Sequence, residues 1–212
     1  HAHEDHIGGL LAIVRNFRPR EVWTGAFPPT DSWRRMRAEI EAAGTRVVSP
    51  KAGETRLWGG IRVEVVSPPV DYTPGAQPKN NDSLGLLLRY RKSSLLMVGD
   101  LERAMELRLV NHNRLSRVDL LKVGHHGSRT STTPPFLDAT RPTWAVISAG
   151  AGNLFRHPHP EVTKRLTHQG VSIWRTDLHG QVRFLTDGHR WRVEPYWLQG
   201  TPVASGWRRM VD

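Results

Sequence analysis

The chain has 212 residues, which is enough for one large domain or two small ones, and 38% of them are hydrophobic, which suffices for a core. It contains no cysteine, so disulfide bonds, a disulfide-linked partner and thiolate metal sites are excluded. There is no run of about 18 apolar residues and no recognisable signal peptide, so neither a membrane span nor a leader is predicted. The formal net charge of +10 fits a merely soluble surface, but it also favours a polyanionic partner such as nucleic acid.

Hydrophobic periodicity and turn residues predict the elements of the first half of the chain. We expect helices over 10–17, where Pro19 follows, and from Thr30 or Asp31 to 43, where Gly44 follows. The expected strands are 21–24 and 46–48, a hairpin of 56–58 with 61–66, and a hairpin of 83–90 with 94–98. Residues 68–82 form a proline-rich loop, either a lid or binding segment or a plain connector.

The second half alternates between strands and helices. We expect helices over 101–110, 134–139 and 160–168, and strands over 118–123, 144–148, 171–175, 182–185 and 189–193. Hairpins together with this alternation predict mixed sheets whose outer faces are covered by helices. No repeat or linker divides the chain, so we expect one domain over 1–195 and a polar tail over 196–212 without assigned structure.

The first six residues combine three imidazoles and a carboxylate in an H-x-H-x-D-H pattern. If the segment is extended, His1 and His3 point the same way and can hold one divalent metal ion. Asp5 and His6 follow where a helix is expected from about Ile7, and they can hold a second ion. The alternative is a chance pattern or a tag-like tract among the 11 histidines of the chain, but Asp5 and the residues after His6 are not tag-like.

Asp100 follows the apolar strand 94–98 directly after a glycine. A carboxylate at the end of a strand is well placed for a site at the edge of a sheet. Its alternative role is the N-cap of the helix expected from Leu101, since aspartate is a favoured capping residue.

A second strand end carries His125 and His126 after Gly124. These imidazoles either join a metal site or are two histidines in a surface loop. Behind them, Ser128, Arg129 and Thr130 offer hydroxyl, amide and guanidinium donors that suit an anion such as phosphate, although an ordinary polar turn has the same composition.

His157 and His159 lie on a proline-stiffened turn at the start of the helix 160–168. Either imidazole can orient or protonate a leaving oxygen, while Pro160 also suits plain helix initiation. Farther on, residues 175–180 contain Arg175, Asp177 and His179 and are expected to form a hairpin that reaches the same edge.

Together these motifs resemble the metallo-β-lactamase superfamily, and in finer detail the C-terminal β-lactamase-like domain of the ComEC competence DNA-uptake channel family. The resemblance rests on the first six residues and on the segments 81–84, 98–102, 121–128, 147–150, 153–160 and 175–177. It implies an αββα sandwich with the site at one sheet edge. Relatives have strands before the first motif, so we expect upstream residues of the natural protein to precede His1.

The resemblance also implies the composition of the site. Two divalent ions, Mn or Zn, are expected to share Asp100, which with Asp5, His157 and His159 forms the expected catalytic group. Asn81 stands where most superfamily enzymes have a histidine. The implied metal ligands are His1, His3, Asp5, His6, Asn81, Asp100, His125 and His126, and the implied phosphate contacts are Lys122, Ser128, Arg129 and Thr130.

The implied activity is that of a metal-dependent deoxyribonuclease, which uses activated water to hydrolyse the DNA strand that is not transported. Its expected partners are DNA and the membrane channel of the same polypeptide, and its expected place is the extracytoplasmic side of a bacterial membrane. Two alternatives stay open: a small-molecule hydrolase on the same fold, and a non-catalytic module that guides DNA with a degraded metal site.

Overall fold

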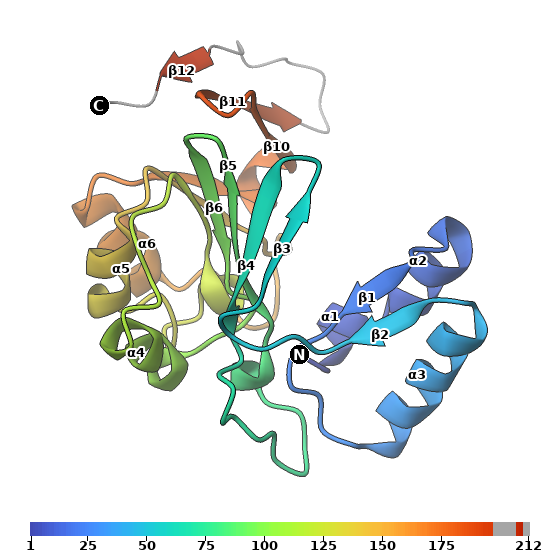
Figure 1. Ribbon diagram of the computed structural model, residues 1–212. Helices are drawn as coiled ribbons and strands as arrows, with labels where there is room; N and C mark the ends of the chain where they lie inside the picture. The colour runs from blue at the N-terminus through green and yellow to red at the C-terminus, as the bar shows by residue number, and fades with distance from the viewer. Residues whose placement is uncertain (197–206, 210–212) are drawn as a thin grey trace.

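A mixed sheet of seven strands organises the computed structural model, which describes residues 1–196 and 207–209 (Figure 1). In spatial order its strands are β3 Thr55–Trp58, β4 Ile61–Ser67, β5 Gly85–Tyr90, β6 Ser93–Met97, β7 Leu120–Lys122, β8 Trp144–Ile147 and β9 Ser172–Arg175. The strands β3 to β6 pair antiparallel, with tight hairpins from β3 to β4 and from β5 to β6 and the long loop 68–84 between β4 and β5, whereas β6 to β9 run parallel. Parallel neighbours need long crossovers, and helices supply them here.

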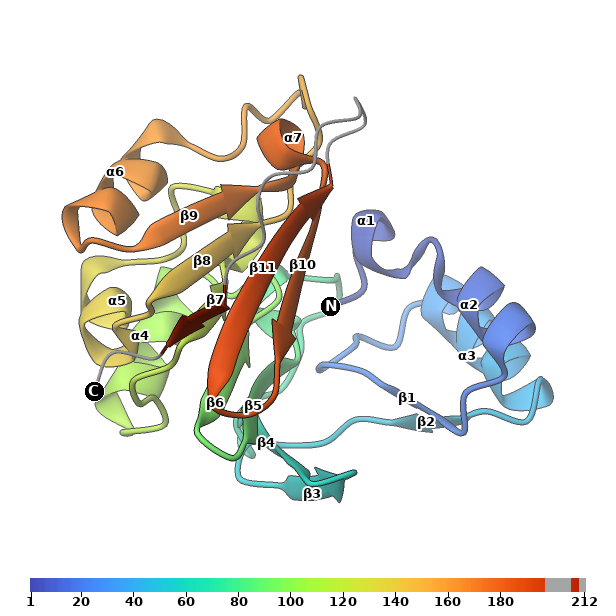
Figure 2. The same ribbon diagram turned by 90° about the horizontal axis from the view of Figure 1, so that it is seen from above.

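Three helices cover one face of this sheet: α4 Arg103–Asn111, α5 Pro134–Thr140 and α6 Pro160–His168 (Figure 2). The alternation of side chains along a strand turns Leu96 and Leu121 toward the helices, where they join the main core with Phe136 and Leu166. No helix in the described part of the chain is long and apolar enough to cross a membrane.

A smaller antiparallel sheet lies against the other face, made of β10 Gln181–Thr186, β11 Arg190–Tyr196 and β12 Trp207–Arg209 (Figure 2). The two sheets meet through Leu120, Trp144 and Trp191, all buried, and the rings of the two tryptophans lie 6.2 Å apart. Leu120 is the neighbour of Leu121 on β7, so one strand contributes to both cores.

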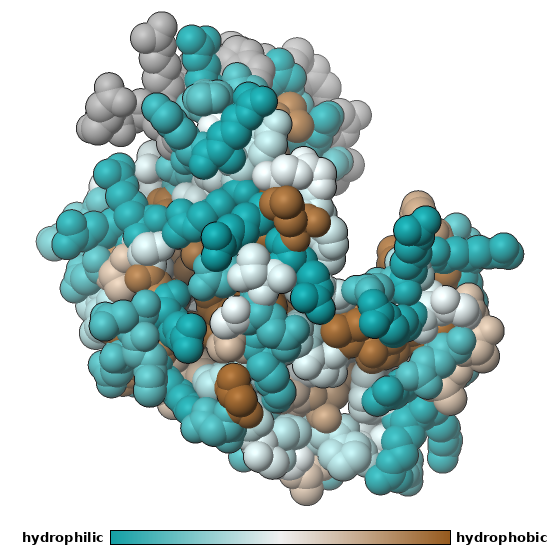
Figure 3. All heavy atoms as spheres, in the orientation of Figure 1, coloured by the Kyte–Doolittle hydropathy of each residue, from teal (hydrophilic) through white to brown (hydrophobic). Residues whose placement is uncertain are grey.

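The N-terminal unit comprises α1 Glu4–Ile7, α2 Leu10–Phe17, β1 Glu21–Trp23, α3 Asp31–Ala42 and β2 Arg46–Val48. The strands β1 and β2 pair parallel, and the two longer helices cover them through Val14, Trp33 and Ile40. A hollow lined by Trp23 and Trp58, among others, separates this unit from the seven-stranded sheet (Figure 3). Helices therefore lie outside sheets on both sides, which confirms the expected αββα class.

Most predicted elements are confirmed to within a few residues, and four differences concern the ends of elements. The helix expected from Ile7 begins at Glu4, and the helix expected from Leu101 begins at Arg103. The expected hairpin after Arg175 contains a short helix instead, α7 Thr176–His179. The expected boundary at 195 falls within β11, and Trp207–Arg209 of the expected tail pairs with that strand; the rest of the tail lies outside the described residues.

Candidate metal centre

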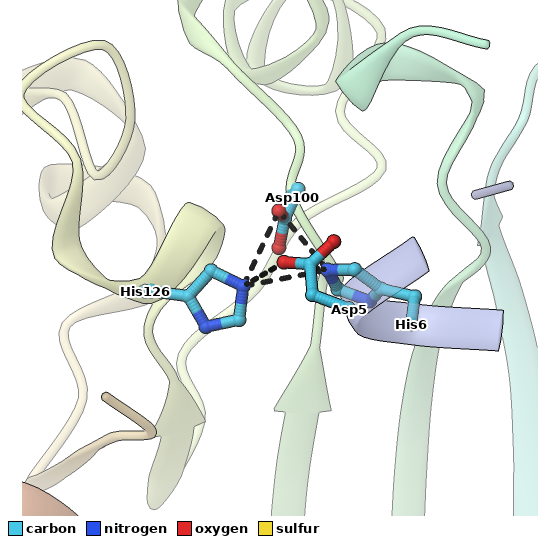
Figure 4. Close-up of side chains that lie close together, drawn as sticks. All are labelled: Asp5, His6, Asp100 and His126. Atoms are coloured by element: carbon cyan, nitrogen blue, oxygen red, sulfur yellow. Dashed lines mark hydrogen bonds and ion pairs between the residues drawn. The ribbon is translucent and has the colours of Figure 1, made fainter. Parts of the chain in front are cut away.

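The carboxyl ends of the parallel strands β6 to β9 lie at one edge of the sheet, where side chains of consecutive loops converge. Asp100 follows β6, and His126 follows β7 on the short 3-10 turn Gly124–Gly127. The helix α1 approaches the same edge from the N-terminal unit and contributes Asp5 and His6 (Figure 4). Because α1 begins before these two residues, both project from one helical turn.

Asp5, His6, Asp100 and His126 form a cluster in which all four ligand atoms lie within 4.8 Å of one another (Figure 4). The Oδ2 atom of Asp100 lies 3.1 Å from Nε2 of His6 and 3.5 Å from Nε2 of His126. Asp5 Oδ2 lies 3.3 Å from the His126 nitrogen and 3.6 Å from the His6 nitrogen. Two imidazoles and two carboxylates at such separations match the donor set of a zinc or manganese site.

Asp100 is 2% exposed and forms the centre of the cluster. Its side chain does not cap α4, whose N-cap is Glu102, and this excludes the capping role considered from the sequence. Burial opposes ionisation of this carboxyl, but hydrogen bonds and charge from His126 and His6 outweigh it and hold the pKa of Asp100 far below its usual range. Its Oδ1 atom is buried without a hydrogen-bond partner among the described residues, which fits an oxygen that takes a cation.

His126 is oriented by the carbonyl group of Ser148, which lies 2.8 Å from Nδ1. A carbonyl oxygen only accepts, so the proton is on Nδ1 and Nε2 faces the cluster, which is the usual arrangement of a metal-binding histidine. Hydrogen bonding to Asp100 raises the pKa of His126 above its ordinary value in the absence of a cation. The backbone reaches this pose through left-handed φ angles of 46° at His125 and 52° at His126.

His1 and His3 border the cluster. His1 is buried, with Nε2 3.8 Å from Asp100 Oδ2 and 3.0 Å from Nδ1 of His3. His3 is also 3.2 Å from the carbonyl oxygen of Pro78. The expected division into a His1–His3 site and an Asp5–His6 site is therefore only partly reproduced, since Asp5 and His6 join Asp100 and His126 directly.

Ser83 is a functional residue that sequence reasoning missed. Its buried Oγ accepts a hydrogen bond from the backbone N–H of Asp100 at 3.0 Å and lies 3.1 Å from Nδ1 of His1. One hydroxyl thus fixes both the loop of Asp100 and the ring of His1. The only sequence signal was its position directly after Asn81 and Asp82 in the segment that carried the family resemblance.

Besides His1 and His3 at the border, two further expected ligands, Asn81 and His125, lie outside the four-residue cluster. The Oδ1 atom of Asn81 accepts a hydrogen bond from the backbone N–H of Glu102 at 2.9 Å, so it serves the start of α4. The Nδ1 atom of His125 lies 3.4 Å from Glu102 Oε1 and 3.5 Å from Thr130 Oγ1. Because consecutive residues of a turn project differently, only His126 of this histidine pair reaches the cluster.

The four expected phosphate contacts differ in accessibility. Lys122 donates to the carbonyl oxygen of Val123 at 2.8 Å, and burial lowers the pKa of its amine, against the effect of the Asp100 charge. Ser128 is buried, with Oγ 3.0 Å from Oγ1 of Thr130. Arg129 and Thr130 are exposed and line a hollow with Arg103. Only Arg129 and Thr130 are therefore open to a large anion.

His157 and His159 have different surroundings. The ring of His157 is 5.6 Å from that of His125, and burial with the neighbouring positive histidines lowers its pKa. His159 is the N-cap of α6; its backbone N–H donates to Gly127, and its Nδ1 atom is buried without a partner among the described residues. The Nδ1 atom of His159 is therefore shielded from solvent, whereas the ring of His157 contacts that of His125.

Comparison with families of known proteins gives one match over most of the chain. The model of the metallo-β-lactamase superfamily matches residues 1–151, a range that contains Asp5, His6, Asp100 and His126.

Two curated relatives carry competence or recombination names. ComE operon protein 3 of Bacillus subtilis is 31% identical over 185 residues, which cover 87% of this chain and 24% of the relative. Recombination protein 2 of Haemophilus influenzae is 35% identical over 132 residues, which cover 62% of this chain and 16% of the relative. The chain therefore spans a quarter or less of the length of these relatives.

Solved structures confirm the fold class at low sequence identity. A metal-dependent hydrolase of the β-lactamase superfamily aligns with 82% of this chain and 73% of its own, with a TM-score of 0.51 and 14% identity. CmlA, a diiron β-hydroxylase from Streptomyces venezuelae, aligns with 82% of this chain and 42% of its own, with a TM-score of 0.51 and 16% identity.

Proposed function

The chain belongs to the metallo-β-lactamase superfamily, and on this premise we propose that it is a metal-dependent phosphodiesterase that hydrolyses DNA. Its homologues include competence proteins of the ComEC family, so the proposed substrate is the DNA strand that is not transported during uptake. The observation that carries the proposal is the buried Asp100 carboxylate, held between His6 and His126 with one oxygen left without a protein partner.

The donor set suits the divalent metals that this superfamily binds. We propose two ions, manganese or zinc, held by Asp5, His6, Asp100 and His126, with His1 and His3 contributing at the border. Such ions supply Lewis acidity and lower the pKa of a water molecule from about 15.7 toward about 7.

The protein contributes preorganisation of this centre. His6 and His126 keep Asp100 ionised at neutral pH, although burial alone would favour the neutral acid. Ser83 fixes the Asp100 loop and Ser148 fixes the tautomer of His126, so little reorganisation accompanies cation binding.

Proton transfer to the leaving oxygen is assigned to His157. Its ring lies 5.6 Å from that of His125, on the turn that also carries His126, and burial lowers the pKa of this imidazole. Arg129 and Thr130 are placed to contact the phosphate next to the bond that breaks, because they are exposed beside His125.

The charge of the chain favours a nucleic-acid phosphodiester over a small lactone or thioester. A formal net charge of +10 attracts polyanions. The hollow that Arg103 and Arg129 line also contains Glu102 and Glu161, so the charge of the whole chain carries this argument. We further propose that the partner of this domain is a membrane channel in the same polypeptide and that the domain acts on the extracytoplasmic side. This chain covers 24% or less of its two relatives, so most of the length of those proteins lies outside the match and could contain a channel.

A cleavage assay on a fluorescently labelled oligonucleotide tests the proposal. We expect cleavage with Mn²⁺ or Zn²⁺ and none after chelation. The His126→Ala variant should lower the rate about 100-fold or more, because charge stabilisation at the reacting group is lost. His168→Ala is the matched control, since His168 is exposed at the end of α6 and should leave the rate unchanged.

Equal rates for His126→Ala and the unaltered chain under the same metal would exclude this centre as the catalyst. Salt-sensitive DNA binding without cleavage under any divalent ion would instead support a module that only guides DNA. Hydrolysis of a small ester or lactone without cleavage of DNA would support the small-molecule alternative.

A further inference from the structure

The loop between β8 and α6 follows the same sheet edge as the metal centre and exposes two large apolar side chains. Leu154 is 95% exposed and Phe155 is 78% exposed. Neither contributes to a hydrophobic core cluster of the described residues. An exposed aromatic side chain beside a site of chemistry calls for an explanation other than folding.

Hydrogen bonds of Asn153 hold this loop in one shape. The side-chain amide group of Asn153 donates to the carbonyl oxygens of Gly150 at 2.9 Å and His157 at 2.6 Å. Its Oδ1 atom accepts from the backbone N–H of His157 at 2.9 Å. The two residues that follow Asn153 are therefore presented on a closed turn.

The same loop is attached to the turn that carries His126. The backbone N–H of His159 donates to the carbonyl oxygen of Gly127 at 2.8 Å. A Cβ atom on Gly127 would lie 2.5 Å from Cβ of Pro158, so the two segments touch closely. The position of Phe155 relative to the metal centre is thus fixed by backbone contacts.

Aromatic rings form a continuous row from the centre to the surface. The His126 and His125 rings are 6.4 Å apart, His125 and His157 are 5.6 Å apart, and His157 and Phe155 are 5.8 Å apart. The last pair is stacked, with an angle of 25° between the ring planes. His157 therefore supports one face of Phe155, while the exposure of this residue leaves the other face open to solvent.

We propose that the open face of Phe155 stacks against an unpaired nucleobase next to the phosphate that is cleaved, and thereby selects single-stranded DNA. This inference rests on the proposed function and deepens it. Bases of a single strand offer a free π-face, whereas bases within a duplex are already stacked on their neighbours. Arg156 is exposed beside Phe155 and supplies positive charge for the backbone of the same strand.

The size and surroundings of the patch favour a base over a protein partner. The patch consists of two apolar side chains followed by an arginine. It is far smaller than one side of a stable protein interface, which comprises roughly 20–30 residues. One aromatic ring on a fixed support matches the stacking platforms of single-strand binding proteins, in which successive bases meet single aromatic residues.

The test compares Phe155→Ala and Phe155→Trp with the unaltered chain. Binding to a fluorescently labelled oligothymidylate and to a blunt duplex is measured by fluorescence anisotropy in EDTA, where no cleavage occurs. Phe17→Ala is the matched control, because Phe17 is 73% exposed on α2 in the N-terminal unit. The same variants are then assayed for cleavage of the single strand with Mn²⁺.

We expect Phe155→Ala to weaken single-strand binding about 10-fold and to raise KM with little change in kcat, because one stacking contact is lost. Phe155→Trp should retain binding, since indole also stacks, and duplex binding should not change in either variant. Unchanged single-strand binding in Phe155→Ala, or an equal loss for duplex and single strand, would overturn the inference. Absence of cleavage by the unaltered chain, together with the expected binding pattern, would support the stacking role and contradict the nuclease proposal alone.

Discussion

At the scale of single residues, the ionisation of Asp100 explains why this position attracts a cation. A carboxyl group that is 2% exposed loses most of its hydration, and this burial by itself raises the pKa of Asp100. His6 and His126 oppose this effect from two separate elements. The remaining buried oxygen lacks a hydrogen-bond donor among the described residues, so a bound divalent ion would complete its coordination.

The hydroxyl group of Ser83 gives a prediction at this scale. We expect Ser83→Ala to weaken the binding of Mn²⁺ or Zn²⁺ about 10- to 100-fold, because loss of an orienting hydrogen bond loosens His1 and the Asp100 loop. Isothermal titration calorimetry measures the affinity. Ser93→Ala is the control, since Ser93 is equally buried but bonds to Thr186 in a distant hairpin. Equal affinity in Ser83→Ala and the unaltered chain would refute this role.

Sequence reasoning identified the imidazoles and carboxylates of the site but not the way each side chain points. The choice between His125 and His126 depends on left-handed backbone angles and on the Ser148 carbonyl, and neither is encoded in a residue pattern. The family resemblance led us to expect Asn81 as a ligand, yet its side-chain oxygen accepts a hydrogen bond from the backbone N–H of Glu102. Such outcomes depend on tertiary contacts between segments far apart in the chain.

At the scale of elements, parallel pairing of β6 to β9 turns separate loop motifs into one site. The strand ends before Asp100 and His125 were predictable from short apolar runs followed by glycine. The glycine pair at 59–60 correctly predicted the first hairpin. The start of α4 at Arg103 was not predictable, because Asp100 is a good capping residue that the site uses otherwise.

The turn between β10 and β11 gives a prediction about pH. Asp187 accepts hydrogen bonds from the backbone N–H groups of His189 and Arg190, both at 2.8 Å, and these bonds lower the pKa of its carboxyl. A carboxyl whose pKa is lower in the folded state stabilises the fold above its unfolded pKa, and this contribution is lost as the pH falls. We therefore expect Asp187→Ala to lower the urea midpoint at pH 7 and to lower it less at acidic pH. A difference that stays constant or grows on acidification would contradict the assignment.

At the scale of the whole molecule, the N-terminal unit and the seven-stranded sheet come together at one edge. The N-terminal unit contributes α1, and the seven-stranded sheet contributes the loops after β6 and β7. Hydrophilic side chains dominate the face shown in Figure 3, in keeping with the net charge of +10. The αββα class was expected from the family resemblance. The order of hairpins, strands and helices along the chain predicted by itself only mixed sheets covered by helices.

Calorimetric titration of Asp100→Asn with Mn²⁺ or Zn²⁺ is the sharpest test of whether the cluster around Asp100 binds divalent metal ions. Removal of outer-shell partners of metal ligands costs about 10- to 100-fold in affinity, so loss of the ligand itself should cost more. Asp138→Asn, at an exposed carboxylate on α5, should bind as the unaltered chain does. We expect tight binding by the unaltered chain and its loss in Asp100→Asn alone; binding of equal strength in all three proteins would rule out this cluster as the metal site.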